Sequence, residues 1–350
     1  MLDYFNPAVT FDDVLLAPRY NSIPSRKDVD VSTKMGRCTF DIPIMSSNMD
    51  TITGEDMALE MDKLGGVGVL HRFMSAKESA DTYKSIQKLC DISDQLYDFY
   101  RKKLVIISLG VNEDLERLKL CHKAGARLFC LDIAHGHQWK VKERIREIKN
   151  YNSEFEGKTD DIYLIAGNVA TPEGAQFLLD SGADAVKIGI GPGSACSTRL
   201  NTGCGIPQLT AIMSIADACP DACLIADGGI RSPGDVVKAL AAGANMVMLG
   251  GMLAGTDETP GDGSTFRGMA SKEAMREHTE QAADYKTAEG ESFEVPGKGP
   301  VKDVIQHILG GLRSGMTYCG ASNISELQAR ADFVRITPSG MVESSPHLQV

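Results

Sequence analysis

The stretch that decides the fold is 222–250, ACLIADGGIRSPGDVVKALAAGANMVMLG. Two apolar runs, ACLIA and NMVMLG, flank a segment that carries the signals of a helix start and a helix end. Ser232 before Pro233 is typical of an N-cap followed by proline at the first helical position, and Asp235 completes a capping-box-like start. Gly243 is typical of a helix that ends by turning through the left-handed region. The stretch therefore predicts a strand, a helix and a second strand.

The same unit recurs with a period of about sixty residues. Four apolar runs begin 60, 59 and 60 residues apart: PIMSS from Pro43, KLVIIS from Lys103, IYLIA from Ile162 and ACLIA from Ala222. Four more lie between them, each after a helical segment and a glycine (Gly65, Gly125, Gly182, Gly243): VGVL from Val67, RLFCLDI from Arg127, DAVKIGI from Asp184 and NMVMLG from Asn245. Continuous apolar runs are typical of parallel strands that are covered on both faces. Eight of them interleaved with helices predict an α/β fold, a single-domain (β/α)8 TIM barrel, with a doubly wound open sheet as the alternative.

Composition excludes several classes of protein. With 43% hydrophobic and 24% charged residues among 350, bulk disorder is excluded. A net charge of −11 gives no general basic field for nucleic acid. The start lacks a basic segment followed by an apolar core, and no apolar run approaches roughly 18 residues, so we expect neither a signal peptide nor a membrane partner. The nine cysteines form no Cys-x-x-Cys pair, which favours reduced core thiols and a cytoplasmic protein.

The whole chain, 1–350, is expected to form one catalytic domain. Residues 1–40 are an N-terminal extension that we expect to wrap the outside of the barrel. Residues 256–300 are polar and glycine-rich, follow the eighth strand and form a candidate active-site lid. Residues 333–350 form a C-terminal tail.

Chemistry in such a barrel lies at the carboxyl ends of the strands. Strands seven and eight are both followed by a Gly-Gly pair, at 228–229 and 250–251, where this fold usually binds phosphate. The alternative is that these glycines only make tight turns. Asp227 lies beside the first pair, where its carboxylate could accept hydrogen bonds from a ribose diol, or serve as a helix cap or structural partner.

Cys196 lies in a different environment from the other cysteines. It is part of GIGPGSACSTR, a glycine-rich loop with hydroxyls and Arg199 close by. A thiol in such surroundings is a candidate nucleophile, and an inert thiol is the alternative. The carbonyl groups of the same loop could also bind a monovalent cation. The 35 glycines thus gather largely at turns into strands and at strand ends.

Several of these motifs resemble one known family. GIGPGSACSTR, NMDT, AGNVAT, ADGGIRSPGDV, FRGM and GGLRSGMTYCGA are similar to motifs of the IMP dehydrogenase / GMP reductase family, and the resemblance extends from Phe11 to the tail. It implies a (β/α)8 barrel, commonly a homotetramer or an octamer, that binds a purine nucleotide at the strand ends with a nicotinamide cofactor beside it. It also implies that the cysteine thiolate attacks C2 of the purine. The dehydrogenase branch then passes hydride to NAD and hydrolyses the adduct, whereas the reductase branch expels ammonia and takes hydride from NADPH.

Differences between the branches favour GMP reductase. The segment HRFMSAKESADTYKSIQKL has no room for the CBS domains that most dehydrogenases insert, and 269–289 contains no Arg-Tyr pair to activate water. Other features resemble the dehydrogenase: ADGGIRSP, FDDVLLAPRY and the tail, while Lys286 and Ala270 replace an arginine and a serine that reductases carry. The alternative is therefore an IMP dehydrogenase without CBS domains, and a second alternative is a nucleotide-binding sensor that has lost turnover.

The resemblance also implies roles for individual residues. The catalytic group is Cys196, Thr198 and Glu289. The substrate-binding group is Ser47, Met49, Ser194, Asp227, Gly229, Gly250, Gly251, Met269, Ala270, Lys286 and Gly290. The side that binds NADPH comprises Asp132, Ala134, Gly136 and His137, and the carbonyls of Gly191, Gly193 and Cys196 are candidate ligands of a potassium ion.

Overall fold

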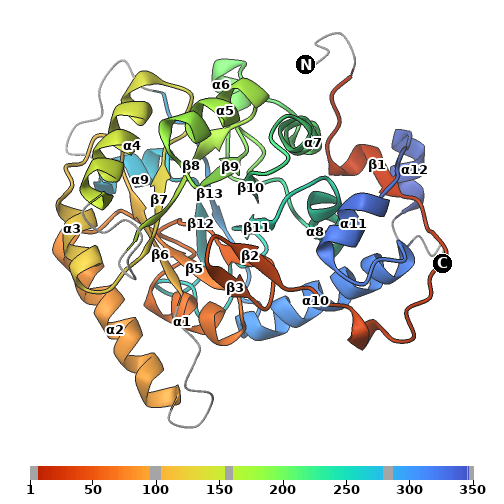
Figure 1. The fold of residues 1–350 in the computed structure, drawn as a ribbon, viewed down its shortest axis with the longest axis horizontal. Coiled ribbons are helices and arrows are strands. Elements are labelled where there is room, and N and C mark those ends of the chain that lie inside the picture. The colour runs from red at the N-terminus through yellow and green to blue at the C-terminus, as the bar shows by residue number, and fades with distance from the viewer. Residues whose placement is uncertain (1–6, 95–103, 154–160, 279–286, 345, 347–350) are drawn as a thin grey trace.

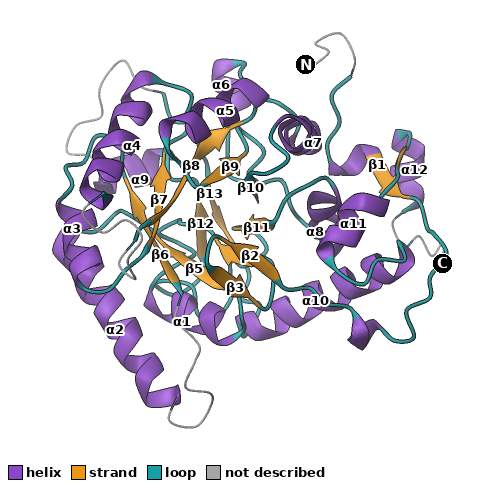
Figure 2. Ribbon diagram, in the orientation of Figure 1, coloured by secondary structure: helices purple, strands orange, loops and turns teal. Residues whose placement is uncertain are grey.

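The computed structural model describes residues 7–94, 104–153, 161–278, 287–344 and 346, which form a closed barrel of eight parallel strands inside a layer of helices (Figures 1 and 2). The strands are β4 (Ile44–Ser46), β5 (Val67–Leu70), β6 (Val105–Leu109), β7 (Leu128–Asp132), β8 (Tyr163–Val169), β9 (Ala185–Ile188), β10 (Cys223–Asp227) and β11 (Met246–Leu249). The barrel closes where β11 pairs with β4, with Val247 opposite Ile44. The prediction of a (β/α)8 barrel is confirmed, and the open-sheet alternative is wrong.

A helix on the outside of the barrel follows each strand. In chain order these helices are α1 (Glu55–Lys63), α2 (Ala76–Asp94), α3 (Glu116–Lys123), α4 (Trp139–Asn152), α5 (Pro172–Ser181), α7 (Gln208–Ala218), α8 (Pro233–Ala241) and α10 (Val301–Tyr318). The predicted capping box of α8 is present: the Ser232 hydroxyl accepts from the Asp235 N–H at 3.2 Å, and the Asp235 carboxylate accepts from the Ser232 N–H at 3.1 Å. Gly65, Gly125, Gly182 and Gly243 all have positive φ angles, so the helices before β5, β7, β9 and β11 end as expected. The connection from β5 to β6 holds α2 and no inserted domain.

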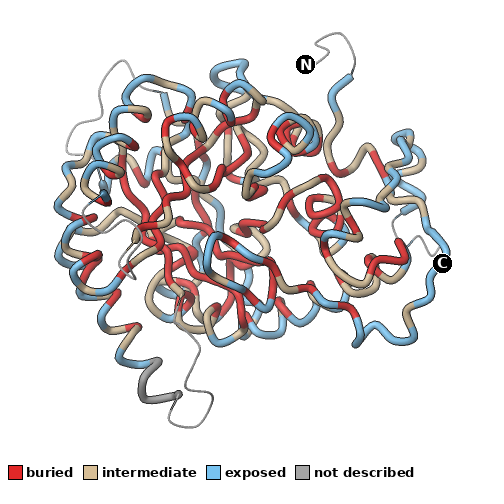
Figure 3. Tube along the Cα trace, viewed as in Figure 1, coloured by how far each residue is buried: buried red, intermediate tan, exposed pale blue. Residues whose placement is uncertain are grey.

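The core has two layers, which Figure 3 shows as buried chain along the strands and on the inner sides of the helices. Leu, Ile, Val and Ala side chains fill the space between strands and helices. A second cluster fills the barrel itself and includes Met45, Val67, Ile106, Ile165 and Ile225. Because the barrel is packed rather than open, a ligand has room only at the ends of the strands.

The N-terminal segment differs in part from expectation. The hairpin of β2 (Thr33–Met35) and β3 (Cys38–Phe40) does not lie on the outer wall, because Met35 and Phe40 are buried in the cluster that fills the barrel. It covers the amino ends of the strands, where Gly36 contacts the ring of Tyr163. The expectation that 1–40 wraps the outside therefore fails for the hairpin, since two large apolar side chains gain more burial in the barrel base than on its wall.

A strand from the N-terminal segment and a strand from the tail pair on the outside of the barrel. There, β1 (Val14–Leu16) pairs antiparallel with β14 (Phe333–Arg335) of the tail, next to α11 (Ile324–Arg330) and α12 (Pro338–Glu343) (Figure 1). Within the described ranges, the helices are too short or too polar to span a bilayer.

The candidate lid between β11 and α10 contains regular structure. It holds β12 (Thr265–Arg267), α9 (Lys272–His278) and β13 (Ser292–Glu294), and β12 pairs antiparallel with β13. The two strands bring Phe266 to within 4 Å of the space above Gly250 and Gly251, so this segment lies over the carboxyl end of the barrel.

Candidate functional site

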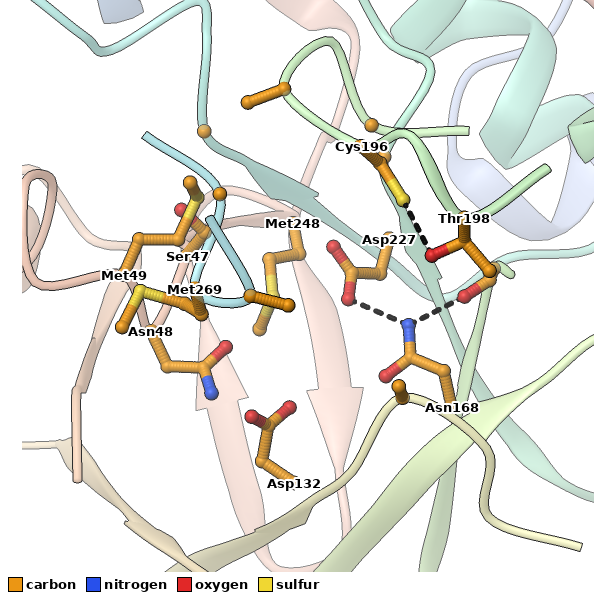
Figure 4. Close-up of a pocket in the computed structure, with 18 of the residues that line it drawn as sticks. Ser47, Asn48, Met49, Asp132, Asn168, Cys196, Thr198, Asp227, Met248 and Met269 are labelled. Atoms are coloured by element: carbon orange, nitrogen blue, oxygen red, sulfur yellow. Dashed lines mark hydrogen bonds between the residues drawn. The ribbon is translucent and has the colours of Figure 1, made fainter. Parts of the chain in front are cut away.

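A pocket of about 620 Å³ lies at the carboxyl ends of the barrel strands. The loops after β4, β7, β9, β10 and β11 form its walls, and the segment between β12 and β13 closes one side. Figure 4 shows its lining residues, with Ser47, Met49 and Met269 on one side and Cys196 and Thr198 on the other. Residues from distant parts of the sequence therefore face one cavity.

The candidate nucleophile lies at one end of a hydrogen-bonded chain. The Cys196 thiol donates to the Thr198 hydroxyl at 3.2 Å, and that hydroxyl donates to Oε2 of Glu289 at 2.8 Å. Figure 4 shows the sulfur pointing toward Thr198. A thiol, a hydroxyl and a carboxylate in series can move the thiol proton to the carboxylate, which is what a nucleophilic cysteine requires.

Backbone pairing holds Glu289 at this position. The Ser197 N–H donates to the Glu289 carbonyl, and the Glu291 N–H donates to the Ala195 carbonyl, both at 2.9 Å. Cys196 and Gly290 thus lie opposite each other in a short antiparallel bridge. The lid and the cysteine loop are hydrogen-bonded to each other on both sides of the nucleophile.

Two glycine pairs and the Ser47 hydroxyl also line the pocket. Gly228 and Gly229 have φ angles of +90° and +78°, a conformation that favours glycine. A Cβ on Gly250 would lie 3.1 Å from the Ser47 hydroxyl, so these two groups are in contact. That hydroxyl is buried and has no partner among the described residues. An anion placed here would satisfy it, which fits the phosphate site expected from the sequence.

A buried ionic cluster forms the floor of the pocket. The Lys187 ammonium of β9 lies 2.6 Å from a carboxylate oxygen of Asp227 and 3.1 Å from one of Asp132. Asn168 donates to Asp227 at 2.9 Å, a bond that Figure 4 also shows. Burial opposes the charged form of Asp132, but Lys187 and Arg72 outweigh it and hold the pKa of this carboxyl below its usual value.

The pocket continues past Asp132 to the ends of β5 and β6. Its lining there includes Arg72, Phe73 and the segment 110–113. The Arg72 guanidinium lies 4.7 Å from the centroid of the Phe73 ring, and its Nε is buried without a hydrogen-bond partner among the described residues. An aromatic face and an unsatisfied donor beside Asp132 fit a second planar polar ligand, such as a nicotinamide group.

Most of the sequence-predicted residues line this one pocket. They are Ser47, Met49, Asp132, Ala134, Gly191, Gly193, Ser194, Cys196, Thr198, Asp227, Gly229, Gly250, Gly251, Met269, Ala270 and Glu289. The carbonyl of Gly193, one of the candidate potassium ligands, already accepts from the Cys196 N–H at 3.0 Å. Potassium therefore stays a prediction of the resemblance.

Three predicted residues lie elsewhere, and one lies outside the described part of the chain. Gly136 is buried behind the pocket wall, where its N–H donates to the Asn168 carbonyl at 2.7 Å. His137 is exposed and packs against Phe177, so it does not reach the pocket. Gly290 supports the site through the bridge to Cys196 without lining it. Lys286 falls in 279–286, outside the described residues.

Sequence reasoning missed the two polar residues on the pocket floor. Asn168 lies inside the AGNVAT motif and Lys187 inside DAVKIGI, an apolar run that predicts only a buried strand. A lysine in the middle of such a run is itself a signal, because a fully buried lysine needs a charged partner.

A buried carboxylate fastens the lid to the loop after β4. Asp50 accepts from the Arg267 guanidinium of β12 and, at 2.8 Å, from Nε2 of His278 in α9. Its side chain is only 7% exposed. Burial opposes ionisation of Asp50, but the hydrogen bonds from Arg267 and His278 outweigh it and hold its pKa below the usual value. Arg267 also pairs with Glu277, whose side chain is largely exposed.

Comparison with known proteins gives consistent matches. A family model described as "IMP dehydrogenase / GMP reductase domain" matches residues 8–347. The inosine-5'-monophosphate dehydrogenase of Nitrosopumilus maritimus is 34% identical, with 98% of this chain and 98% of that protein covered. The corresponding enzyme of Borreliella burgdorferi is 37% identical, with 97% and 96% covered. A crystal structure of a cysteine-to-alanine variant of GMP reductase from Trypanosoma brucei, in complex with guanosine 5'-monophosphate, is similar with a TM-score of 0.88 and 30% identity over 99% of each chain.

The Asp50 attachment predicts a stability difference that depends on pH. Asp50→Asn is expected to lower the free energy of unfolding by about 3 kcal/mol at pH 7, because it leaves Arg267 without its buried partner. The pKa of Asp50 is lowered in the fold, so its contribution is complete above the unfolded pKa of about 3.9 and is lost as pH falls through the folded value. Urea unfolding measured from pH 7 to pH 3 gives the free energy of unfolding of each protein. The difference in this free energy between wild type and Asp50→Asn should become smaller below about pH 4.

The control for this prediction is Glu277→Gln, which removes an exposed partner of the same arginine. It should change stability by less than about 1 kcal/mol. If the difference in free energy of unfolding between wild type and Asp50→Asn keeps its full size down to pH 3, ionised Asp50 is not the source of the stabilisation.

Proposed function

Since the chain belongs to the IMP dehydrogenase / GMP reductase family of oxidoreductases that act on purine nucleotides, we propose that it is a GMP reductase. The reaction is the NADPH-dependent reductive deamination of GMP to IMP and ammonia. The observation that carries this proposal is the hydrogen-bonded series Cys196, Thr198 and Glu289, in which the acidic end comes from a compact lid without an Arg-Tyr pair.

The series accounts for both proton transfers that the reaction needs. As the Cys196 sulfur bonds to C2 of the purine, the thiol proton passes through the Thr198 hydroxyl to Glu289. The same proton returns along the same path to the 2-amino group, and the C2–N bond breaks to release ammonia. A reduced nicotinamide dinucleotide, when bound beside Asp132, would supply the hydride that ends on C2. As C2 gains it, the C2–S bond breaks and Cys196 leaves as the thiolate.

The remaining groups of the pocket bind and orient the two reactants. Gly229, Gly250, Gly251 and the unsatisfied Ser47 hydroxyl would hold the 5'-phosphate, and Asp227 would accept from the ribose diol. Ser194 lies on the same wall, and Met49, Met269 and Ala270 would flank the base. On the other side, Asp132, Ala134 and Arg72 would hold the nicotinamide end of the cofactor.

The lid supports a reductase more than a dehydrogenase. The backbone bridge between Cys196 and Gly290 keeps the lid over one side of the nucleophile. A dehydrogenase must instead admit a water molecule beside the nucleophile and activate it. The alignment with the Nitrosopumilus enzyme also spans 477 positions, well above the 350 residues here, so that dehydrogenase carries an insertion that this chain lacks.

An IMP dehydrogenase without CBS domains remains the second candidate, and a specific observation favours it. The curated relatives reported above are named as dehydrogenases, and the alignment with the Borreliella enzyme spans only 399 positions, so a dehydrogenase with a short insertion exists. In that case the protein would oxidise IMP to XMP with NAD.

The decisive assay offers both reactions to the same preparation. With GMP and NADPH, we expect loss of the reduced-nicotinamide absorbance together with equimolar ammonia and IMP. With IMP and NAD, we expect little or no gain of that absorbance. The reverse pattern would replace the reductase by the dehydrogenase, and binding without turnover in either direction would favour the sensor.

The role of the nucleophile is tested by Cys196→Ala. Turnover should fall below detection while GMP binding, measured by calorimetry, is largely kept, because the thiol forms a bond only during the reaction. Cys204→Ala is the matched control, since Cys204 is an exposed thiol that follows the short helix α6 (Thr198–Thr202) in the same connection between β9 and α7. Equal loss of turnover in both variants would remove Cys196 from the mechanism.

The role of the carboxylate is tested by Glu289→Gln. The amide keeps the shape but not the proton affinity, so kcat should fall roughly 10²- to 10⁴-fold with a small change in KM for GMP. The control is Glu291→Gln, which alters an exposed carboxylate two residues along the same segment. If Glu289→Gln changes KM and leaves kcat unaffected, Glu289 binds substrate and does not transfer a proton.

A further inference from the structure

We propose that Lys187 is a positioning residue that joins the nucleotide half of the pocket to the cofactor half by holding Asp227 and Asp132 on one ammonium group. Assigning Asp227 to the ribose and Asp132 to the cofactor rests on the proposed function. The link itself rests on the geometry of the pocket floor.

The hydrogen bonds of Lys187 separate it from a ligand-binding lysine. An ammonium group has three N–H donors. Those of Lys187 meet Asp227 at 2.6 Å, Asp132 at 3.1 Å and the side-chain oxygen of Asn168. The side chain is 3% exposed, although the residue borders the pocket. With every donor engaged inside the protein, Lys187 has none left for a substrate, so its effect on binding must pass through its partners.

The partners of Lys187 are themselves fixed from other strands. The Asn168 amide of β8 donates to Asp227 of β10 and to the Gly189 carbonyl at 2.8 Å. The Asn48 side chain, from the loop after β4, donates to Asp132 at the end of β7. Figure 4 shows Asp132 and Asp227 facing the same space from different sides, with Asn48 near the first and Asn168 near the second. One lysine thus links groups that come from four separate strand ends.

Charge explains why the link is required. Two carboxylates and one ammonium carry a net charge of −1, and the other ionisable groups that face them are Arg72 beside Asp132 and the Cys130 thiol of β7. Burial raises the pKa of Cys130 to about 12, so this thiol stays neutral. Burial also opposes the charged form of Lys187, but Asp227 and Asp132 outweigh it and raise its pKa. Without the ammonium, the two carboxylates would share this part of the pocket with no cation between them, and their mutual repulsion would favour protonation of one of them.

A protonated carboxyl binds a diol poorly. A ribose diol donates two hydrogen bonds, and only an ionised carboxylate accepts both without competition from its own O–H. Lys187 therefore supports Asp227 as an acceptor by placing a positive charge 2.6 Å from its carboxylate. The same ammonium group also holds Asp132, so a change in the charge of Asp132 alters the electrostatic field at Asp227. Ligand binding in the cofactor half of the pocket therefore affects ligand binding in the nucleotide half.

The experiment restores the charge without restoring the lysine. Lys187→Met changes the cluster charge from −1 to −2, and the double variant Lys187→Met with Asp132→Asn returns it to −1. Dissociation constants for GMP and IMP are measured by calorimetry between pH 6 and pH 9, without turnover. Lys238→Met is the matched control, because Lys238 of α8 is a largely buried lysine that bonds the Phe11 carbonyl away from the pocket.

We expect Lys187→Met to weaken nucleotide binding roughly 30-fold or more at pH 6.5, as expected for loss of one member of a buried charge pair, with recovery as the pH rises. The double variant should regain most of this affinity and lose the new pH dependence. Lys238→Met should resemble wild type. Restored nucleotide binding in the double variant would separate positioning from a merely structural role.

Three results would overturn the proposal. The first is wild-type affinity and pH profile in Lys187→Met. The second is a double variant that binds the nucleotide as weakly as the single one. The third is a double variant that fails to fold, which assigns Lys187 to folding alone. These results are distinct from failure of the proposed function, because a dehydrogenase would oxidise IMP in the turnover assay and would still report on Lys187 through IMP binding.

Discussion

The candidate site depends on the backbone pairing between the cysteine loop and the segment around Gly290. Two hydrogen bonds of 2.9 Å place Glu289 next to Thr198, although 91 residues separate them in the sequence. Gly290 lies close to Gly268 and to the Ala195 carbonyl, and a Cβ at this position would come within 3.0 Å of the Ser271 N. The absence of a side chain there lets three segments of chain meet beside the thiol. If they were about 1 Å further apart, the 2.8 Å hydrogen bond between the Glu289 carboxylate and the Thr198 hydroxyl would be lost.

Most of the fold could be predicted from sequence because its local signals agree. Each apolar run of the sixty-residue period became a strand of the barrel, and each predicted cap or turn, such as Ser232 and Gly243, lies where a helix begins or ends. Closure of the barrel followed from the number of units. The β2–β3 hairpin was misjudged because its burial is decided by a gap at the barrel base, which is a tertiary feature that no local pattern of Met35 or Phe40 encodes.

The site was predictable where a residue type is unusual for its position. A cysteine among glycines and hydroxyls, an aspartate after a strand and paired glycines at strand ends all indicate chemistry. His137 was assigned by proximity to a motif alone, and its ring instead packs against Phe177 on the surface. Asn168 and Lys187 were not predicted as site residues because their neighbours in the sequence are largely apolar. Their polar partners come from other strands. The role of such polar residues can be recognised only from the tertiary structure, in which neighbouring strands bring their partners close.

The hairpin that covers the amino ends of the strands has a consequence for where a ligand can enter. With Met35 and Phe40 filling the base, the pocket formed by the described residues opens at the other end of the barrel, where the lid lies. The hairpin and the lid therefore border opposite ends of one barrel. The hairpin keeps the amino end solid, and Phe266 and Glu289 of the lid lie at the end that a ligand can enter.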